Sequence, residues 1–165
     1  MKLAKSLNRL GTETAFSVLA EAKKLEASGK PMIHLGLGQP DFKTPKHVVD
    51  AAKKALDDGH HGYVLSNGIL ECRQAVSRKI KTLYNQDVDP ERIIIMPGGK
   101  PTMHYAIQCF GEPGVEIIHP TPAFPIYESM INYTGSTPVP YDLTKDKDLK
   151  FNAEEILSLI TDKTR

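Results

Sequence analysis

Apolar residues recur every three or four positions in several stretches of the chain, and this spacing is typical of helices that bury one face. The pattern predicts a first helix at about Glu13–Ala27, whose apolar stripe is formed by Ala15, Val18, Leu19, Ala22 and Leu25. Further helices are predicted at about 45–59, 69–83, 101–110 and 126–133. The segment Asn152-Ala153-Glu154-Glu155 has the form of a capping box, which predicts the start of a last helix.

Short runs of β-branched and apolar residues between these helices predict strands. Ile93-Ile94-Ile95 suits a strand that is buried on both faces, and Val115–His119 predicts a second strand. Shorter strands are predicted at Ile33–Leu35 and near Pro138–Tyr141. Because strands and helices alternate along the chain, the sequence predicts an α/β fold with a largely parallel sheet.

Composition excludes several classes of function. The 165 residues are 40% hydrophobic and 25% charged, which is ordinary for a globular protein. A net charge of +1 gives no electrostatic reason to expect binding to nucleic acid or to an anionic membrane. No apolar run approaches the roughly 20 residues of a membrane span, and no signal peptide is recognisable, so a cytoplasmic location is expected. The histidines and two cysteines show no metal-binding spacing, so no metal site is expected.

The strongest chemical signal is Gly98-Gly99-Lys100-Pro101, which joins a predicted strand to a predicted helix. Pro101 is suited to the first position of that helix, and the free N–H groups of a helix start favour an anion. Lys100 adds a cation at the same place, so a phosphate is the expected ligand. An NTPase P-loop is excluded because Ile94 stands in place of its first glycine and Pro101 in place of its metal-binding hydroxyl. A plain tight turn remains the alternative.

Phe124 is a second candidate binding residue. It lies in the loop Pro120–Pro125, which follows the predicted strand Val115–His119. Ligands of open α/β sheets bind outside the carboxyl ends of the strands, so this loop and the glycine loop open on the same side if their strands are parallel. The ring of Phe124 is therefore a candidate for stacking on a flat ligand; the alternative is a phenylalanine that only anchors its loop.

Taken together, the loops of the chain resemble those of a known family. The motifs are Gly38-Gln39-Pro40-Asp41-Phe42 with Thr44-Pro45, Tyr63 before Gly68, Gly98-Gly99-Lys100, and Pro120-Thr121-Pro122 with Phe124 and Tyr127. In order and separation they resemble the N-terminal part of the class I/II aminotransferases, which are fold-type-I enzymes that depend on pyridoxal 5′-phosphate. Each motif is weak alone, but the four in register cover essentially the whole chain.

The resemblance implies a role for each matching residue. Gly98, Gly99 and Lys100 match the cup for the cofactor phosphate, and Phe124 matches the aromatic residue stacked on the pyridine ring. Gly38 matches the backbone position beside the substrate α-carboxylate. Tyr63 matches a tyrosine that reaches the partner's cofactor phosphate across the interface of a homodimer. The substrates implied are an amino acid and a 2-oxo acid, and the arm at residues 1–12 is expected to pack on the partner.

The resemblance also implies what the chain lacks. In this family the Schiff-base lysine, the acid paired with the pyridine nitrogen and the carboxylate-binding arginine all come later in the sequence, so no catalytic residue is expected here. The chain is interpreted as an N-terminal fragment, inactive by itself. Residues 46–165 would be part of a three-layer α/β/α large domain, while residues 1–45 would contribute to the small domain and the substrate loop.

Two other interpretations stay open from the sequence. The parent protein could be a C–S lyase or a cyclopropane-carboxylate synthase, because both share these N-terminal motifs. Alternatively, the chain could be a non-enzymatic fragment that binds a phosphate weakly or serves as a surface for a partner.

Overall fold

The computed structural model describes residues 2–11 and 14–165, so the predicted helix start at Glu13 lies outside the described residues. The chain forms two compact units, each described by itself. One unit combines the residues up to Leu37 with Gly98–Arg165, and we call it the sheet unit. The other, Gly38–Pro97, we call the helix unit. The predicted domain boundary after residue 45 stays a prediction.

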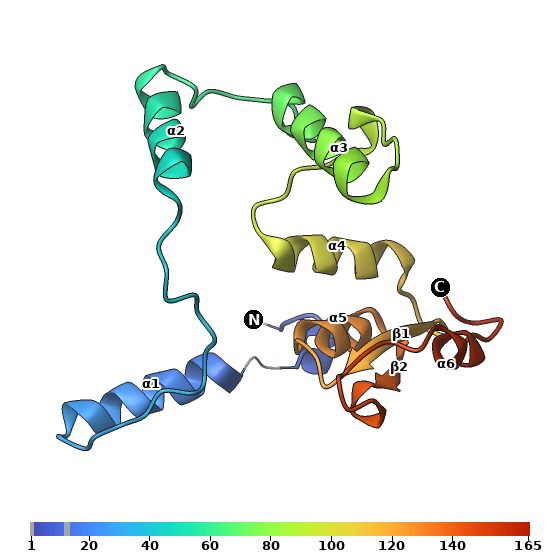
Figure 1. Cartoon of the computed structure of the whole chain (residues 1–165). Helices are drawn as coiled ribbons and strands as arrows, with labels where there is room; N and C mark the ends of the chain where they lie inside the picture. Colours follow the sequence, from blue (N-terminus) through green and yellow to red (C-terminus); the bar gives the residue numbers. More distant parts are fainter. Residues whose placement is uncertain (1, 12–13) are drawn as a thin grey trace. The chain divides into compact units, whose positions relative to one another are not determined.

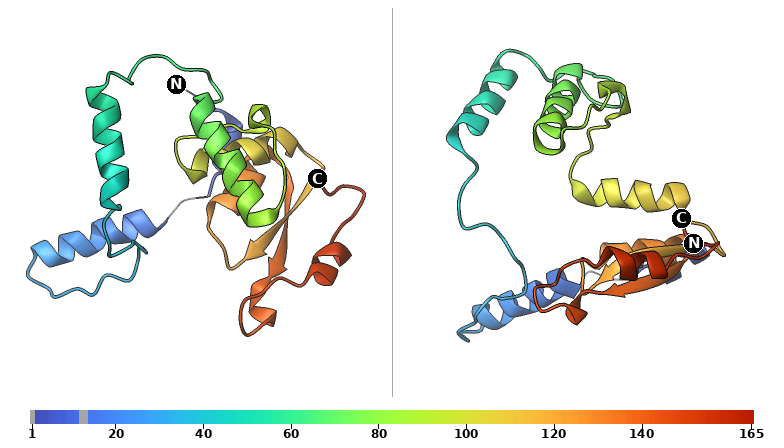
Figure 2. Two further views of the ribbon diagram at one scale, coloured as in Figure 1. Left: turned by 45° about the horizontal axis from the view of Figure 1, so that its top comes forward. Right: turned by 45° about the vertical axis from the view of Figure 1, so that its right-hand side comes forward.

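The sheet unit contains the only strands among the described residues (Figure 1). Its two strands, β1 (Glu116–Thr121) and β2 (Thr137–Asp142), pair in parallel, with Glu116 opposite Thr137. Figure 2 shows them running side by side. The other elements are the short 3-10 turns η1 (Lys5–Arg9) and η3 (Leu143–Lys145) and the helices α1 (Thr14–Ala27), α4 (Gly99–Phe110), α5 (Ile126–Thr134) and α6 (Ala153–Ser158). The parallel β1–α5–β2 unit confirms the predicted α/β class.

Helix α5 forms the centre of the packing in the sheet unit. It contacts β1, β2, α4 and η1. The apolar side chains Val115, Met130, Ile131 and Tyr141 are buried, and Ile131 has no exposed surface at all. The helix ends at Gly135, whose φ of 89° is a left-handed conformation that favours glycine. Burial of one helix face against two strands is therefore what holds this unit together.

The two edges of the strand pair differ. Thr137 donates its N–H to the carbonyl of Val115, at 2.8 Å, so by the alternation of a parallel ladder Pro138 and Pro140 face the outer edge of β2. Proline has no N–H, and this edge therefore lacks donors at both positions. At the other edge, Glu116 of β1 bonds in both directions, accepting from Arg165 N–H at 3.1 Å and donating to the carbonyl of Lys163 at 2.9 Å.

The helix unit has helices but no strand in the described structure. It contains α2 (Lys46–Asp57), α3 (Leu70–Tyr84) and a 3-10 turn, η2 (Pro90–Arg92). The buried guanidinium of Arg73 in α3 donates to the carbonyl of Gly68 at 3.1 Å, to the carbonyl of Pro90 at 2.9 Å and to the carboxylate of Glu91 at 2.7 Å. One side chain thus joins the loop before α3 to the turn after it.

Two predicted strands do not form. Ile93-Ile94-Ile95 is extended, yet Ile94 is 64% exposed and the described chain supplies no neighbouring strand for it. The N–H of Ile95 donates to the carbonyl of Asn67 at 3.1 Å and the N–H of Ile93 to the carbonyl of Pro90 at 3.2 Å, and neither bond belongs to a strand ladder. Ile33–Leu35 is likewise irregular. The physical reason is that β-branched residues favour extended backbone, but a strand also requires a ladder partner.

Of two predicted helix starts, one needs correction and the other is confirmed. Helix α4 begins at Gly99 rather than Pro101, and proline is tolerated there because the first turn has N–H groups without intrahelical acceptors. At α6, Asn152 caps the N–H groups of Glu154 and Glu155 as predicted. The N–H of Asn152 donates to the hydroxyl of Tyr141 at 2.8 Å, rather than to Glu155 as the reciprocal half of a capping box would require.

None of the helices in the described ranges is long and apolar enough to cross a membrane.

Candidate functional site

The site is built on the turn that starts α4. Gly98 precedes the helix with φ 95° and ψ 167°, a conformation that L-residues with a side chain rarely adopt. A Cβ added to Gly98 or Gly99 would meet no described atom within 4 Å. The space in front of this helix start is therefore open to a ligand that approaches the backbone.

The helix start provides a concentration of donors. The N–H groups of Gly98 and Gly99 precede the first intrahelical hydrogen bond, so they have no acceptor within α4. The positive end of the helix dipole lies at the same place, and the side chain of Lys100 adds a full charge. Open space, backbone donors and positive charge together fit a phosphate group.

Phe124 lies beside this helix start, as the sequence predicted it would if both loops opened on one side. The Nζ atom of Lys100 is 5.2 Å from the centroid of the Phe124 ring, and the Phe124 residue is 40% exposed. Phe124 belongs to the loop between β1 and α5, directly before Pro125, which is the N-cap residue of α5 and makes no side-chain capping bond. The structure thus brings together the glycine turn, Lys100 and Phe124 from two loops of the sheet unit.

A second aromatic ring, Phe16 of α1, completes the cluster. Its centroid is 5.3 Å from Nζ of Lys100, so the ammonium lies near two rings. The sequence analysis missed Phe16, because it lies off the apolar stripe that predicted α1. An aromatic residue outside such a stripe was the only available signal.

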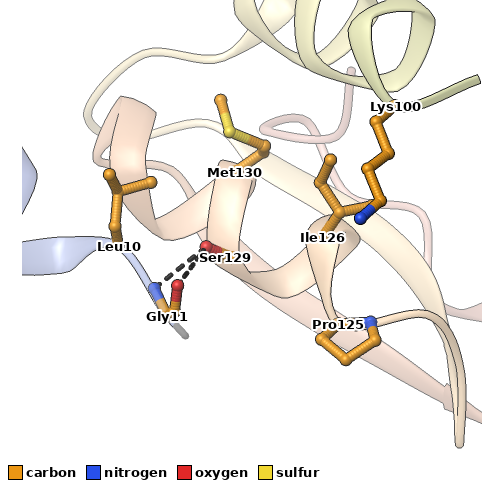
Figure 3. A pocket seen from close by; sticks show the side chains of 7 residues that line it. All are labelled: Leu10, Gly11, Lys100, Pro125, Ile126, Ser129 and Met130. Carbon is orange, nitrogen blue, oxygen red and sulfur yellow. Dashed lines mark hydrogen bonds between the residues drawn. The ribbon is translucent and has the colours of Figure 1, made fainter. Parts of the chain in front are cut away.

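A cavity of about 210 Å³ adjoins Lys100. It is lined by Leu10, Gly11, Lys100, Pro125, Ile126, Ser129 and Met130 (Figure 3). Figure 3 shows the two hydrogen bonds at its edge, in which Gly11 N–H donates to Ser129 Oγ at 2.9 Å and this hydroxyl donates to the Gly11 carbonyl at 3.2 Å.

The N-terminal arm is attached to α5 of its own chain. Besides the bonds of Gly11, the guanidinium of Arg9 donates to the carbonyls of Asn132 and Tyr133 at 2.8 and 2.7 Å. These carbonyls belong to the last turn of α5, where a cation is electrostatically favoured. Packing of the arm on a partner subunit stays a prediction.

Gly38 and Tyr63 belong to the helix unit. Tyr63 is fully exposed and lines a cavity of about 600 Å³ together with Ala55, Gly59, His60, Gly62, Val64, Ile69 and Glu71. A Cβ at Gly38 would meet no described atom within 4 Å. The predicted roles of Tyr63 at a partner's phosphate and of Gly38 at a substrate carboxylate stay predictions.

Comparison with known sequences identifies similar proteins. Residues 30–165 match the family described as aminotransferase class I and II. The aspartate aminotransferase of Bacillus subtilis (strain 168) is 34% identical over 165 residues, which are 100% of this chain and 42% of that protein. The (5-formylfuran-3-yl)methyl phosphate transaminase of Methanocaldococcus jannaschii is 36% identical over 163 residues, 99% of this chain and 42% of that protein.

Solved structures give the same result. Aspartate aminotransferase from Thermus thermophilus with maleate superposes with a TM-score of 0.90 at 29% identity, covering 100% of this chain and 43% of the other. Alanine aminotransferase from Pyrococcus furiosus has a TM-score of 0.89 at 28% identity, covering 99% and 42%. The chain therefore spans about 42% of the length of the curated relatives it matches.

Proposed function

The chain belongs to the class I and II aminotransferase family, and on this premise we propose that the protein carrying it transfers an amino group between an amino acid and a 2-oxo acid. The cofactor proposed is pyridoxal 5′-phosphate, on which the family depends. The relatives named above are transaminases, which favours transamination over the C–S lyase and cyclopropane-carboxylate synthase alternatives. Aspartate is a candidate substrate because several relatives carry it in their names.

The observation that carries the proposal is the start of α4 with Lys100 and Phe124 beside it. The backbone N–H groups of Gly98 and Gly99 would hold the cofactor phosphate, and the Lys100 ammonium would offset its charge. The ring of Phe124 would support the flat pyridine ring, which orients the cofactor. When bound, the cofactor supplies an electron sink for the chemistry at the substrate Cα.

We assign no proton-transfer step to Lys100. It is the second residue of the helix whose start forms the phosphate cup, so its charge is committed to the phosphate end of the cofactor. The residues that would act at the reacting carbon are proposed to lie outside the 165 residues, and this chain by itself is expected not to transaminate.

Two further roles complete the proposal. We propose that Tyr63 reaches the cofactor phosphate of a second subunit in a homodimer, and its full exposure is compatible with such a contact. We also propose that the backbone at Gly38 lies beside the substrate α-carboxylate. Its lack of a side chain and the open space around it would permit close approach.

The test is the variant Gly99→Val in the full-length protein. Because a Cβ at this position meets no described atom within 4 Å, the side chain should not disturb the fold, yet it would fill the space in front of the N–H groups. A charge-assisted hydrogen bond contributes about 1.5–3 kcal/mol, so affinity for 4′-deoxypyridoxine 5′-phosphate, which lacks the aldehyde and binds reversibly, should fall at least about tenfold. Equilibrium dialysis measures it.

The matched control is the same ring without its phosphate. Gly99→Val should leave the affinity for 4′-deoxypyridoxine unchanged, because only the phosphate uses the helix start. If the phosphorylated ligand binds the variant as tightly as the native protein, the phosphate site is elsewhere and the proposal fails.

A further inference from the structure

The turn before α3 contains Asn67-Gly68, the single Asn-Gly pair of the sequence. Asparagine followed by glycine is the pair most prone to deamidation, because no side chain on the second residue hinders attack by its backbone nitrogen on the asparagine amide. Asn67 is half-buried and therefore within reach of water. The pair is a candidate site of covalent modification that the proposed function does not use.

Deamidation at this pair requires only water. The backbone nitrogen of Gly68 gives up its proton and forms a bond to Cγ of Asn67, while the bond from Cγ to the side-chain nitrogen breaks and ammonia leaves. Water then opens the cyclic imide at either of its carbonyls, which gives aspartate or isoaspartate. For the first step the peptide group between the two residues must rotate until its nitrogen faces Cγ. Contacts that fix this peptide group therefore slow the reaction.

The structure fixes this peptide group at both of its polar atoms. The N–H of Gly68 donates to the carbonyl of Leu65 at 2.9 Å, and the carbonyl of Asn67 accepts from the N–H of Ile95 at 3.1 Å. The next carbonyl along the backbone, that of Gly68, accepts from Nε of Arg73 at 3.1 Å. Three hydrogen bonds thus hold three successive polar groups of the turn.

Arg73 is the charged anchor among these contacts. Arg73 is only 2% exposed, and its guanidinium also donates to the carbonyl of Pro90 at 2.9 Å and to the carboxylate of Glu91 at 2.7 Å. Hydrogen bonds to a charged group are stronger than those between neutral groups. If the turn opened, a buried guanidinium N–H would lose its acceptor, which makes opening unfavourable.

The fold requires the glycine that makes Asn67 reactive. Gly68 has a φ of 94°, and a Cβ added to it would lie 2.8 Å from both Cβ and Cγ1 of Ile95. A residue with a side chain is therefore excluded by backbone conformation and by packing. An isoaspartate at position 67 would lengthen the main chain by one carbon, which this close packing against Ile95 does not accommodate.

We propose that Asn67 is a deamidation site whose rate is controlled by Arg73. While the guanidinium holds the Gly68 carbonyl, the peptide group stays in a position from which its nitrogen does not attack. When the turn opens, the imide forms, and the isoaspartate product no longer fits the three hydrogen bonds. The modification thus converts a transient opening of the helix unit into a permanent one.

The test follows Asn67 in the full-length protein during incubation at mildly alkaline pH. Cleavage after lysine releases residues 55–79, in which Asn67 is the only asparagine, so mass spectrometry measures its conversion directly. Arg73→Met should accelerate the conversion about ten- to hundredfold, because the closed turn loses a hydrogen bond to a charged group. The control is Arg78→Met, which replaces an exposed arginine of α3 and should leave the native rate unchanged. In denaturing urea all three proteins should deamidate equally fast.

A milder variant decides the case in which Arg73→Met unfolds, which circular dichroism detects. Glu91→Gln keeps Arg73 and removes the charge of a carboxylate whose side chain is 69% exposed, so the rate should rise about two- to fivefold. Equal rates in Arg73→Met and Arg78→Met, or an unchanged rate in Glu91→Gln where Arg73→Met is unfolded, would contradict the role of Arg73. Deamidation of the folded native protein as fast as in urea would overturn the proposal, because the turn would then give no protection.

Discussion

The two units of the chain differ in what holds them together. In the sheet unit, α5 buries Met130 and Ile131 in a layer that also includes Val115 and Tyr141. In the helix unit, α2 has an apolar stripe but buries none of its residues, and Val48 and Leu56 are 47% and 62% exposed. The buried centre there is the guanidinium of Arg73, with Ile93 beside the turn. An apolar stripe makes a helix, but only a second layer within the same chain makes a core.

The largest effect expected from this difference is in the core of the sheet unit. Ile131→Ala should lower the free energy of unfolding by about 2–5 kcal/mol, because the side chain is fully buried and leaves a cavity. Val48→Ala in α2 should change it by about 0.5 kcal/mol or less, because that side chain is half exposed. Urea denaturation followed by circular dichroism compares the two. Equal losses would mean that the two units do not differ in packing.

The helix unit should instead depend on its buried arginine. Arg73→Met keeps much of the apolar volume but removes three hydrogen bonds and leaves the carbonyls of Gly68 and Pro90 without this donor. The Pro90 carbonyl keeps the Ile93 N–H as a donor at 3.2 Å. Hydrogen bonds to a charged group contribute about 1.5–3 kcal/mol each, so amide hydrogen exchange should accelerate around residues 67–73 and 89–95 and not in the sheet unit. The control is Arg78→Met, which replaces an exposed arginine of the same helix. In this variant the same amides should exchange as slowly as in the native protein.

A smaller effect concerns the aromatic residue of the proposed cofactor site. Phe124→Ala should weaken binding of 4′-deoxypyridoxine 5′-phosphate about three- to tenfold, the equivalent of roughly 0.5–1.5 kcal/mol of aromatic stacking. Phe151→Ala removes a ring from the same unit, one stacked on Tyr141 with centroids 6.0 Å apart, and should leave ligand affinity unchanged. An unchanged dissociation constant for Phe124→Ala would mean that Phe124 only anchors its loop.

The smallest effect lies in the turn after β2. The Thr144 hydroxyl at 2.7 Å and the Thr144 N–H at 2.9 Å hold the pKa of Asp142 below its ordinary value. A lowered folded-state pKa stabilises the fold above the unfolded pKa, and this stabilisation is lost as the pH falls through the folded value. Thr144→Val should raise the pKa of Asp142, whereas Thr144→Ser should keep it low. A carbon-13 NMR titration measures both, and identical pKa values in the two variants would contradict the assignment.

The sequence predicted those elements whose signals are local. The helical spacing of Ile69, Cys72, Val76 and Ile80 located α3, and the apolar run at Val115 located β1. The prediction of a strand at Ile93-Ile94-Ile95 was wrong, because ladder pairing depends on residues that are distant in the sequence. The helix start at Pro101 was placed two residues late because glycine pairs are read as turns, although Gly99 is helical here.

The candidate site was predictable to the same extent. The anion site was predicted from one contiguous turn, which consists of Gly98, Gly99 and Lys100. Phe124 was accessible to sequence reasoning because it follows a strand, where ligands bind in α/β sheets. Phe16 was not, because its contact with Lys100 joins residues 84 positions apart in the sequence, and no local pattern predicts such a contact.

The prolines of β2 make the two edges of the strand pair unequal as places where a further strand can pair. An incoming strand needs donors and acceptors in alternation, and Pro138 and Pro140 deny it donors along one side. A strand recruited from the same polypeptide or from a neighbouring molecule would therefore add beside β1, where Lys163 and Arg165 already bond to Glu116. Two prolines thus disfavour pairing along the outer edge of β2, while at the edge of β1 Glu116 and Ile118 keep their N–H groups and Pro120, near the end of the strand, lacks one.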